Sequence, residues 1–159
     1  MIRILFICHG NICRSPMAEF VFKDIVKKAG ISDKFYVSSA ATSYEEIGNP
    51  VHRGTAKILD RLGISYSGKR AIHLDKSDYE KYDYLVCMDS ANVRNTLRVV
   101  GNDTEKKVHK LLEFVDSYED VADPWYTGDF EKTYEDVFSG CKGLLRHIEN
   151  LNTLIDCEN

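Results

Sequence analysis

The sequence predicts an α/β fold in which a four-stranded parallel sheet carries helices on both faces. Strand and helix signals alternate along the chain, which is the order expected of a parallel sheet. The strand-like segments are short runs of β-branched and aromatic residues, whereas the helical segments repeat their apolar residues at three- and four-residue steps. With 159 residues, 43% of them hydrophobic, the chain is long enough to bury a core without disulfides or a structural metal. We therefore expect one domain over residues 1–159.

The first half of the chain supplies two predicted strands and two predicted helices. Residues 3–7 are a β-branched and aromatic run, too short for a helix. Ser15-Pro16 has the form of a helix N-cap followed by proline at the first helical position, and the helical spacing then continues to a stop at Gly30. Residues 35–40 predict the second strand, and a polar loop leads from it to a helix over residues 51–62.

The second half repeats this order. Residues 83–88 predict a third strand, which runs into a short helix over residues 90–100. Residues 108–112 predict the fourth strand, and the helix over residues 130–151 is the clearest element because its apolar stripe is unbroken. Ligands of such sheets bind beyond the carboxyl ends of the strands, where the strand order reverses. Since the first strand ends at Cys8, the segment that follows it is expected at that edge.

Composition excludes several classes of protein. The 21 basic and 25 acidic residues give a net charge of −4, so the chain lacks the basic footprint of nucleic-acid binding. The apolar run at residues 4–8 is too short for a secretory signal or a membrane span, and we expect a cytoplasmic protein with no membrane contact. The five cysteines form no C-x-x-C and the histidines are scattered, so no metal site is expected.

The residues between the first strand and the first helix form an anion-binding motif. A strand–loop–helix connection of this length can turn successive backbone N–H groups inward, and the positive end of the helix adds to their field. Arg14 at the helix entry can offer paired N–H donors to a tetrahedral oxyanion. The same environment is expected to lower the pKa of the Cys8 thiol, to about 3.5–7.5. A thiolate beside a phosphate site is a nucleophile aimed at phosphorus.

Several segments resemble one known family. Residues 7–19 (ICHGNICRSPMAE) closely match the N-terminal signature of the low-molecular-weight protein tyrosine phosphatases, and residues 123–126 (DPWY) correspond to that family's aspartate-proline-aromatic loop. Residues 39–43 and 83–89 are similar to further family segments at the expected intervals. The resemblance spans essentially the whole chain. It implies a flavodoxin-like (Rossmann-like) fold and phosphotyrosine hydrolysis through a cysteinyl-phosphate, with neither metal nor cofactor.

The resemblance also implies a role for each residue of the site. The nucleophile position matches Cys8, the phosphate-binding arginine matches Arg14, and the general acid matches Asp123. Asn11 and Ser15 match residues that shape the loop and hydrogen-bond the thiolate. The remaining loop positions are His9, Gly10, Ile12 and Cys13, of which Cys13 matches a second cysteine that can form a reversible disulfide with the nucleophile.

Substrate contacts are expected from aromatic side chains around the loop. Trp125 and Tyr126 adjoin the predicted acid and can sandwich an aromatic ring, with Tyr44 as a candidate for the opposite wall. The expected partners are phosphotyrosine-containing proteins, and the chain itself is expected to be a monomer or to self-associate weakly.

The sequence departs from the family pattern outside the loop. The aromatic residue usual after the Ser-Ala-x-Thr segment is replaced by Glu45, and Tyr44 stands one position earlier. The family's Pro-x-Asp-x-Arg pattern is shortened to residues 50–53 (PVHR), and its Ala-Arg-Gln becomes residues 71–73 (AIH). Family members often place a histidine where ungapped alignment puts Lys69. These changes affect the substrate walls and the hydrogen bonds around the loop.

Other functions fit the sequence less well. Thioredoxin-coupled arsenate reductases share the Cys-x₅-Arg loop, but they add a downstream cysteine pair, and Cys87 has no second cysteine near it. A phosphate-binding module without turnover would need neither the thiol of Cys8 nor the acid of Asp123. Dinucleotide binding would need a G-x-G-x-x-G turn, whereas Gly10 is the single glycine of this loop.

Overall fold

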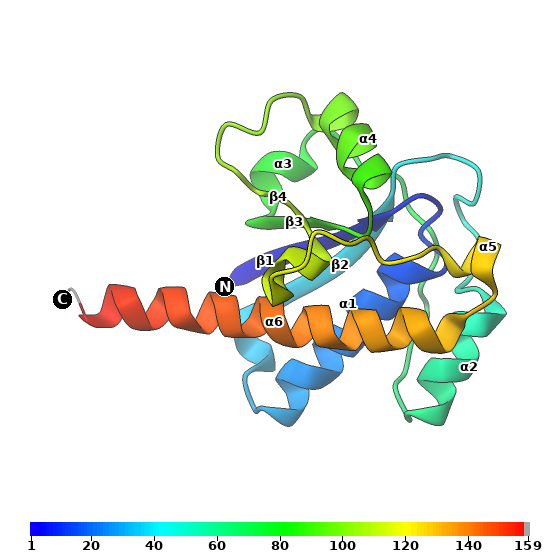
Figure 1. Ribbon diagram of the computed structural model, residues 1–159, viewed down its shortest axis with the longest axis horizontal. Coiled ribbons are helices and arrows are strands. Elements are labelled where there is room, and N and C mark those ends of the chain that lie inside the picture. The colour runs from blue at the N-terminus through cyan, green and yellow to red at the C-terminus, as the bar shows by residue number, and fades with distance from the viewer. Residues whose placement is uncertain (158–159) are drawn as a thin grey trace.

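Four parallel strands form the centre of the structure, in the spatial order β2-β1-β3-β4 (Figure 1). The structure is a computed structural model that describes residues 1–157. Its elements are β1 (Ile2–Cys8), α1 (Arg14–Lys28), β2 (Phe35–Ala41), α2 (Arg53–Arg61), α3 (Asp78–Lys81), β3 (Tyr84–Cys87), α4 (Ser90–Val100), β4 (Val108–Lys110), α5 (Pro124–Thr127) and α6 (Phe130–Cys157), with short 3₁₀ turns at Ser32–Lys34 and Leu111–Val115. The predicted four-stranded parallel sheet is confirmed.

The strand register places Cys8 where a ligand is expected. β1 pairs with β2 from Ile2 opposite Phe35 to Cys8 opposite Ala41, and it pairs on its other side with β3. The chain therefore leaves β1 toward one edge of the sheet, and after β2 it returns to the other side of β1. This reversal of strand order opens a crevice at the carboxyl ends of β1 and β3, and Cys8 is the last residue of β1.

The sheet separates two hydrophobic cores. Alternate side chains of β1 point to opposite faces, so Ile4 and Phe6 belong to the larger core with residues of α1 and α6, whereas Leu5 and Ile7 belong to the smaller core with α3 and α4. Figure 1 shows α1, α2 and α6 below the sheet and α3 and α4 above it. Helices therefore cover both faces, as predicted. None of the helices within residues 1–157 combines the length and the apolar character needed to cross a membrane.

The predicted N-cap at Ser15 is wrong. The helix already begins at Arg14, after Cys13, and no side chain caps it. The Ser15 hydroxyl instead lies 3.0 Å from the sulfur of Cys8 and accepts a hydrogen bond from Asn11. A serine before a proline is a normal capping signal, but here these contacts with the preceding loop occupy its hydroxyl.

The end of the fourth strand also differs from the prediction. Only Val108–Lys110 pairs with β3, and the next residues form the 3₁₀ turn Leu111–Val115. That turn packs directly on α6, where a Cβ at Gly140 would overlap the Leu111 side chain. The apolar pair Leu111 and Leu112 is thus buried by a helix contact rather than by strand pairing. The short helices α3 and α5 were not predicted, because four residues carry too little periodicity.

Candidate active site

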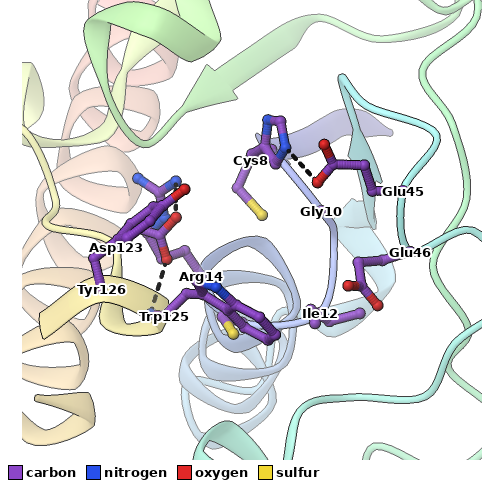
Figure 2. Close-up of a pocket in the computed structure, with 11 residues that line it drawn as sticks. Cys8, Gly10, Ile12, Arg14, Glu45, Glu46, Asp123, Trp125 and Tyr126 are labelled. Carbon is purple, nitrogen blue, oxygen red and sulfur yellow. Dashed lines mark hydrogen bonds and ion pairs between the residues drawn. The ribbon is translucent and has the colours of Figure 1, made fainter. Parts of the chain in front are cut away.

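The segment between β1 and α1 curls around the sulfur of Cys8. The backbone turns at Asn11, whose φ of 58° lies in the left-handed region, and the Asn11 N–H donates to Cys8 Sγ at 3.3 Å. The Ser15 hydroxyl, in the first turn of α1, lies 3.0 Å from the same sulfur. Backbone N–H groups and the positive end of α1 favour an anion here. Figure 2 shows the Cys8 sulfur directed into the pocket, with Asp123 on one side and Glu45 on the other.

The side chain of Asn11 has a fixed orientation. Its Oδ1 accepts from the backbone N–H of Ile72 at 3.1 Å, and a backbone N–H can only donate. The amide nitrogen Nδ2 therefore faces the other way, where it donates to Ser15 Oγ at 2.8 Å and to Ser39 Oγ at 2.9 Å. Asn11, Ser15 and Ser39 are buried, so the amide holds the loop backbone against the neighbouring strand β2.

A buried carboxylate sets the direction of these hydrogen bonds. Glu19 Oε1 lies 2.6 Å from Ser39 Oγ, and because a carboxylate only accepts, the Ser39 hydroxyl donates to it. Ser39 consequently accepts from Asn11, and Ser15 also accepts from Asn11. The single hydroxyl proton of Ser15 is then free to point at Cys8 Sγ. The network thus makes Ser15 a donor to the sulfur, which stabilises negative charge on it.

Lys69 belongs to the same network. Its Nζ donates to the Ser39 carbonyl at 3.0 Å and lies 3.6 Å from Glu19 Oε1, while Lys23 Nζ lies 2.6 Å from the other oxygen of that carboxylate. Burial lowers the pKa of Lys69, and the attraction of Glu19 opposes this effect. Lys69 therefore holds its ammonium group among the hydrogen bonds that surround the phosphate loop, beside the Glu19 carboxylate.

Arg14 is buried and fully engaged by acceptors. Its NH1 donates to Asp89 Oδ2 at 2.7 Å and to the Val121 carbonyl at 3.0 Å, and its NH2 lies 3.3 Å from Asp123 Oδ2. Burial alone would lower the pKa of Arg14, but the negative charges of Cys8, Asp89 and Asp123 raise it above its usual value. The guanidinium is thus a fixed cation whose plane is set by Asp89.

Asp123 lies at the mouth of the pocket, on the opposite side from β2. It is the N-cap of α5, and its Oδ1 accepts from the Trp125 N–H at 3.0 Å while Oδ2 faces Arg14 (Figure 2). Pro124 occupies the first position of this short helix, where a fixed φ favours the turn. The carboxylate is therefore held by backbone on one side and remains partly accessible on the other.

The pocket brings together residues from three separate segments. It is lined by Cys8, His9, Gly10, Ile12, Cys13, Arg14, Glu45, Glu46, Asp123, Trp125 and Tyr126. Asn11 and Ser15 lie beneath the loop as supports rather than on its surface. Trp125 and Tyr126 are exposed at the mouth.

Tyr44 does not lie where the sequence analysis expected it. Its ring stacks on His73, with centroids 3.8 Å apart and planes within 2°, and it is not among the residues that line the pocket. Glu45 and Glu46 take the wall position instead, and Glu45 contacts His9 Nε2 at 3.1 Å. The one-residue displacement of Tyr44 noted in the sequence turns its side chain away from the pocket.

Sequence reasoning missed several residues that shape this site. Asp89 fixes Arg14 although the two are distant in sequence, and its role as the N-cap of α4 was the available signal. Glu19 and Ser39 lie in segments that resemble the family, but the sequence assigns neither of them a role in the site. Among the side chains that the structure describes, no three of His, Cys, Asp and Glu are grouped as metal ligands.

Comparisons with known proteins agree with this geometry. Residues 3–153 match the family model described as "Low molecular weight phosphotyrosine protein phosphatase". The low molecular weight protein-tyrosine-phosphatase YfkJ of Bacillus subtilis is 40% identical over 151 residues, covering 94% of this chain and 97% of that protein. PtpA of Staphylococcus epidermidis, described by the same words, is 40% identical and covers 93% and 94% respectively.

Solved structures agree as well. The crystal structure of YfkJ superposes with a TM-score of 0.91 at 41% identity, covering 94% of this chain and 96% of that one. The low molecular weight protein tyrosine phosphatase SP-PTP from Streptococcus pyogenes gives a TM-score of 0.84 at 41% identity, with coverage of 96% and 98%. Because the family model and these relatives all span nearly the whole chain, the chain belongs to the low molecular weight phosphotyrosine protein phosphatase family.

Proposed function

We propose that this chain hydrolyses phosphotyrosine in proteins, with Cys8 as nucleophile, Arg14 as phosphate ligand and Asp123 as general acid and base. The observation that carries the proposal is the sulfur of Cys8 at the base of the pocket, with the Asn11 N–H at 3.3 Å and the Ser15 hydroxyl at 3.0 Å. These donors stabilise a thiolate before substrate binds. A structural cysteine at the end of a strand would not need them.

In the first chemical step the Cys8 thiolate attacks phosphorus, and the bond from phosphorus to the tyrosyl oxygen breaks. The loop N–H groups and the guanidinium of Arg14 hold the phosphoryl oxygens and neutralise their charge. Protonated Asp123 gives its proton to the departing phenolate. The products of this step are a cysteinyl-phosphate, the protein with an unmodified tyrosyl side chain, and the Asp123 carboxylate.

In the second step the Asp123 carboxylate takes a proton from water, whose oxygen attacks phosphorus. The sulfur–phosphorus bond breaks, which releases inorganic phosphate and restores the Cys8 thiolate. The Ser15 hydroxyl donates to the sulfur and so stabilises it as a leaving group. The network of Glu19, Ser39 and Asn11 serves this step because it leaves the Ser15 proton free to donate.

Phosphotyrosine is the proposed substrate because the phosphate site is recessed between aromatic side chains. Cys8 is buried, whereas Trp125 and Tyr126 stand exposed at the pocket mouth. A phosphate on a phenyl ring reaches the sulfur while the ring packs between these walls. The shorter side chain of phosphoserine would leave its phosphorus out of reach.

The surroundings of Cys87 do not favour arsenate reduction. Its sulfur is buried beside the Thr96 hydroxyl at 3.4 Å, and burial raises its pKa to about 12. Such a thiol is a poor relay for disulfide exchange, which proceeds through a thiolate. A binding module without turnover is disfavoured by Asp123, which the structure holds beside Arg14.

Rapid-mixing kinetics with an aryl phosphate tests the proposal. A burst of phenol equal to the enzyme concentration, followed by slower turnover, is expected from a covalent intermediate, and a chelator should leave both phases unchanged. Mass spectrometry of the acid-quenched enzyme should find the phosphate on Cys8. A phosphorylated enzyme without phosphate on Cys8, or turnover abolished by the chelator, would contradict the mechanism.

We propose further that residues 1–159 form one domain that acts in the cytoplasm as a monomer or weak oligomer. The catalytic thiol requires a reducing compartment, and both cores of the sheet share the strand β1. Size-exclusion chromatography with light scattering over a range of concentrations measures the oligomeric state.

A further inference from the structure

The segment between β2 and α2 forms a wall of the pocket with a fixed backbone. The Ser43 N–H donates to the His9 carbonyl at 3.0 Å, so the wall is joined directly to the phosphate loop. Farther along, the Gly48 N–H donates to the Ala71 carbonyl at 2.8 Å. The backbone between these two anchors therefore has a defined position beside the pocket.

Two adjacent carboxylates on this wall, those of Glu45 and Glu46, line the pocket (Figure 2). We call this pair the acidic wall. Glu45 contacts the imidazole of His9 at 3.1 Å. Glu46 accepts from the amide of Asn49 at 2.6 Å, which is a neutral donor. Among the side chains that the structure describes, no basic nitrogen lies within 4.0 Å of the Glu46 carboxylate.

Glu46 lies close to the phosphate loop itself. Its Cγ is 3.3 Å from the position that a Cβ on Gly10 would take. Burial raises the pKa of Cys13 to about 12; the charges of Cys8 and Asp123 add to this effect, Arg14 opposes it, and Glu46 adds a smaller contribution. An anion bound in the loop is therefore repelled by the acidic wall.

None of the ion pairs within residues 1–157 joins a lysine or an arginine to Glu45 or Glu46. Arg14 is already engaged by Asp89 and Asp123. The loop N–H groups and Arg14 bind the phosphate itself, but an uncharged peptide that carries the phosphate would offer no cation to the carboxylates of the wall. A lysine or arginine beside the phosphotyrosine would face the carboxylates while the phosphate occupies the loop. Charge complementarity of this kind determines which partners bind.

We propose that the acidic wall makes this enzyme select phosphotyrosyl segments with a basic residue adjacent to the phosphotyrosine. The proposal rests on the phosphotyrosine phosphatase function above and specifies its substrate class. With Trp125 and Tyr126 on the opposite side of the pocket, the ring of the phosphotyrosine fills the space between the walls. The neighbouring peptide residues then pass over Glu45 and Glu46.

Three phosphotyrosyl peptides that differ only in the residues flanking the phosphotyrosine test the proposal, with lysine, glutamine or glutamate on both sides. We expect kcat/KM for the lysine peptide to exceed that for the glutamate peptide by about tenfold, mainly through KM. Raising the ionic strength from about 0.1 M to about 1 M shortens the screening length from about 10 Å to about 3 Å and should reduce this preference.

Variants of the wall separate its charge from its shape. Glu46→Gln should reduce the preference for lysine more than Glu45→Gln, because Glu46 lies closer to Gly10 of the phosphate loop, and the double variant should bring it within about twofold. The same variants should bind inorganic phosphate more tightly, since repulsion has been removed. Glu135→Gln, on the exposed surface of α6, is the matched control and should change neither property.

The outcomes distinguish this proposal from the function on which it rests. Efficient hydrolysis of all three peptides at equal rates would overturn the selection by the wall and leave the phosphatase function intact. A lysine preference that persists in the double variant would also overturn it. Failure to hydrolyse any phosphotyrosyl peptide or aryl phosphate would overturn both proposals.

Discussion

The phosphate loop and the pocket mouth differ in how their side chains are held. In the loop, Arg14 is 2% exposed and donates to three acceptors, and Ser15 is fully buried with two polar partners. At the mouth, Tyr126 is 84% exposed. Side chains in the loop therefore have one available geometry, whereas those at the mouth can change with little effect on folding. The difference separates the chemistry from the choice of substrate.

This comparison implies a ranking of mutational effects. Substitutions within the loop remove charge stabilisation that operates only in the transition state, so they should act mainly on kcat. Substitutions at the mouth alter contacts that the substrate makes outside its phosphate, so they should change preference between substrates by smaller factors. The following variants measure the effect on kcat and the effect on substrate preference separately.

The largest effect is expected from Cys8→Ser. A serine hydroxyl is a far weaker nucleophile than a thiolate, so turnover of an aryl phosphate should fall by about 10⁴-fold or more. The backbone N–H groups and Arg14 remain, and vanadate should still bind by calorimetry. Cys87→Ser is the matched control, because this buried thiol should affect thermal stability without abolishing turnover. Activity of Cys8→Ser within tenfold of the unmodified enzyme would exclude Cys8 as the nucleophile.

Arg14→Lys comes next. Lysine keeps the charge but loses the planar fork that contacts Asp89, Val121 and Asp123 together. We expect kcat/KM to fall by about 10²–10³-fold, the usual result of losing a transition-state donor. Arg94→Lys, at an exposed position of α4, should have no effect. If kcat stayed constant and only KM rose, Arg14 would be a binding residue without a role in the transition state.

The same contrast explains what the sequence could predict. The loop is one continuous segment, so a single motif contained Cys8, Arg14 and the residues between them, and the β-α alternation placed that segment at the carboxyl edge of the sheet. The sequence could not predict that Asp89 contacts Arg14, because this contact depends on how β1 and β3 pair. The spacing of residues along one segment carries no information about the distance between Arg14 and Asp89.

The pocket mouth was predicted less well for a related reason. It combines loops that are far apart in the chain, and its exposed side chains are not constrained by packing. Tyr44 was expected to form a wall of the pocket, but its ring stacks on His73. Glu45 and Glu46 line the pocket at that position instead. Ser15 was read as a helix cap, although its hydroxyl is used by the loop. In both cases a tertiary contact determined the geometry.

Glu19→Gln tests whether the loop depends on the buried network. The Ile72 N–H still fixes the direction of the Asn11 amide. A glutamine that donates to Ser39, however, would disturb the Ser39 contact that helps to hold this amide, and with it the position of Ser15 beside the Cys8 sulfur. We expect kcat to fall by about tenfold while the burst of phenol keeps its amplitude. The reason is that weaker stabilisation of the Cys8 sulfur as a leaving group slows only the second step, the hydrolysis of the cysteinyl-phosphate. The measurement is pre-steady-state and steady-state turnover of the same aryl phosphate.

The Glu19→Gln variant also leaves Lys69 buried without its carboxylate, which destabilises the fold. The double variant Glu19→Gln/Lys69→Met removes both charges and provides a folded comparison. It should show the same slow second step at normal thermal stability. Recovery of full kcat in the double variant would mean that Glu19 balances the charge of Lys69 and does not orient Ser15.

Oxidation distinguishes the two thiols of the loop. Burial, with the charges of Cys8 and Asp123, raises the pKa of Cys13 to about 12, so it remains a protonated thiol near neutral pH and should react slowly with iodoacetamide. Peroxide should convert Cys8 to a sulfenic acid, which the Cys13 thiol captures as a disulfide with loss of water. Dithiothreitol should restore activity, and Cys13→Ser should reduce the recovery severalfold. Peptide mapping without a Cys8–Cys13 bridge would contradict this protection.

The smallest effect is expected from Trp125→Ala at the pocket mouth. The Asp123 contact to residue 125 uses the backbone N–H, so the predicted acid keeps its position when the indole is removed. The indole packs edge-on against His52, with ring centroids 5.7 Å apart, which holds it at the pocket mouth. A contact between the indole and the aromatic ring of the substrate contributes about 0.5–1.5 kcal/mol. We therefore expect the preference for phosphotyrosyl over phosphoseryl peptides to shrink by about threefold to tenfold, while the burst with a small aryl phosphate persists. Tyr118→Ala removes a still more exposed aromatic ring outside the pocket and should leave the preference unchanged. An unchanged preference in Trp125→Ala would place the discrimination in the depth of the Cys8 site, because the phosphate loop would then select the substrate without help from the mouth.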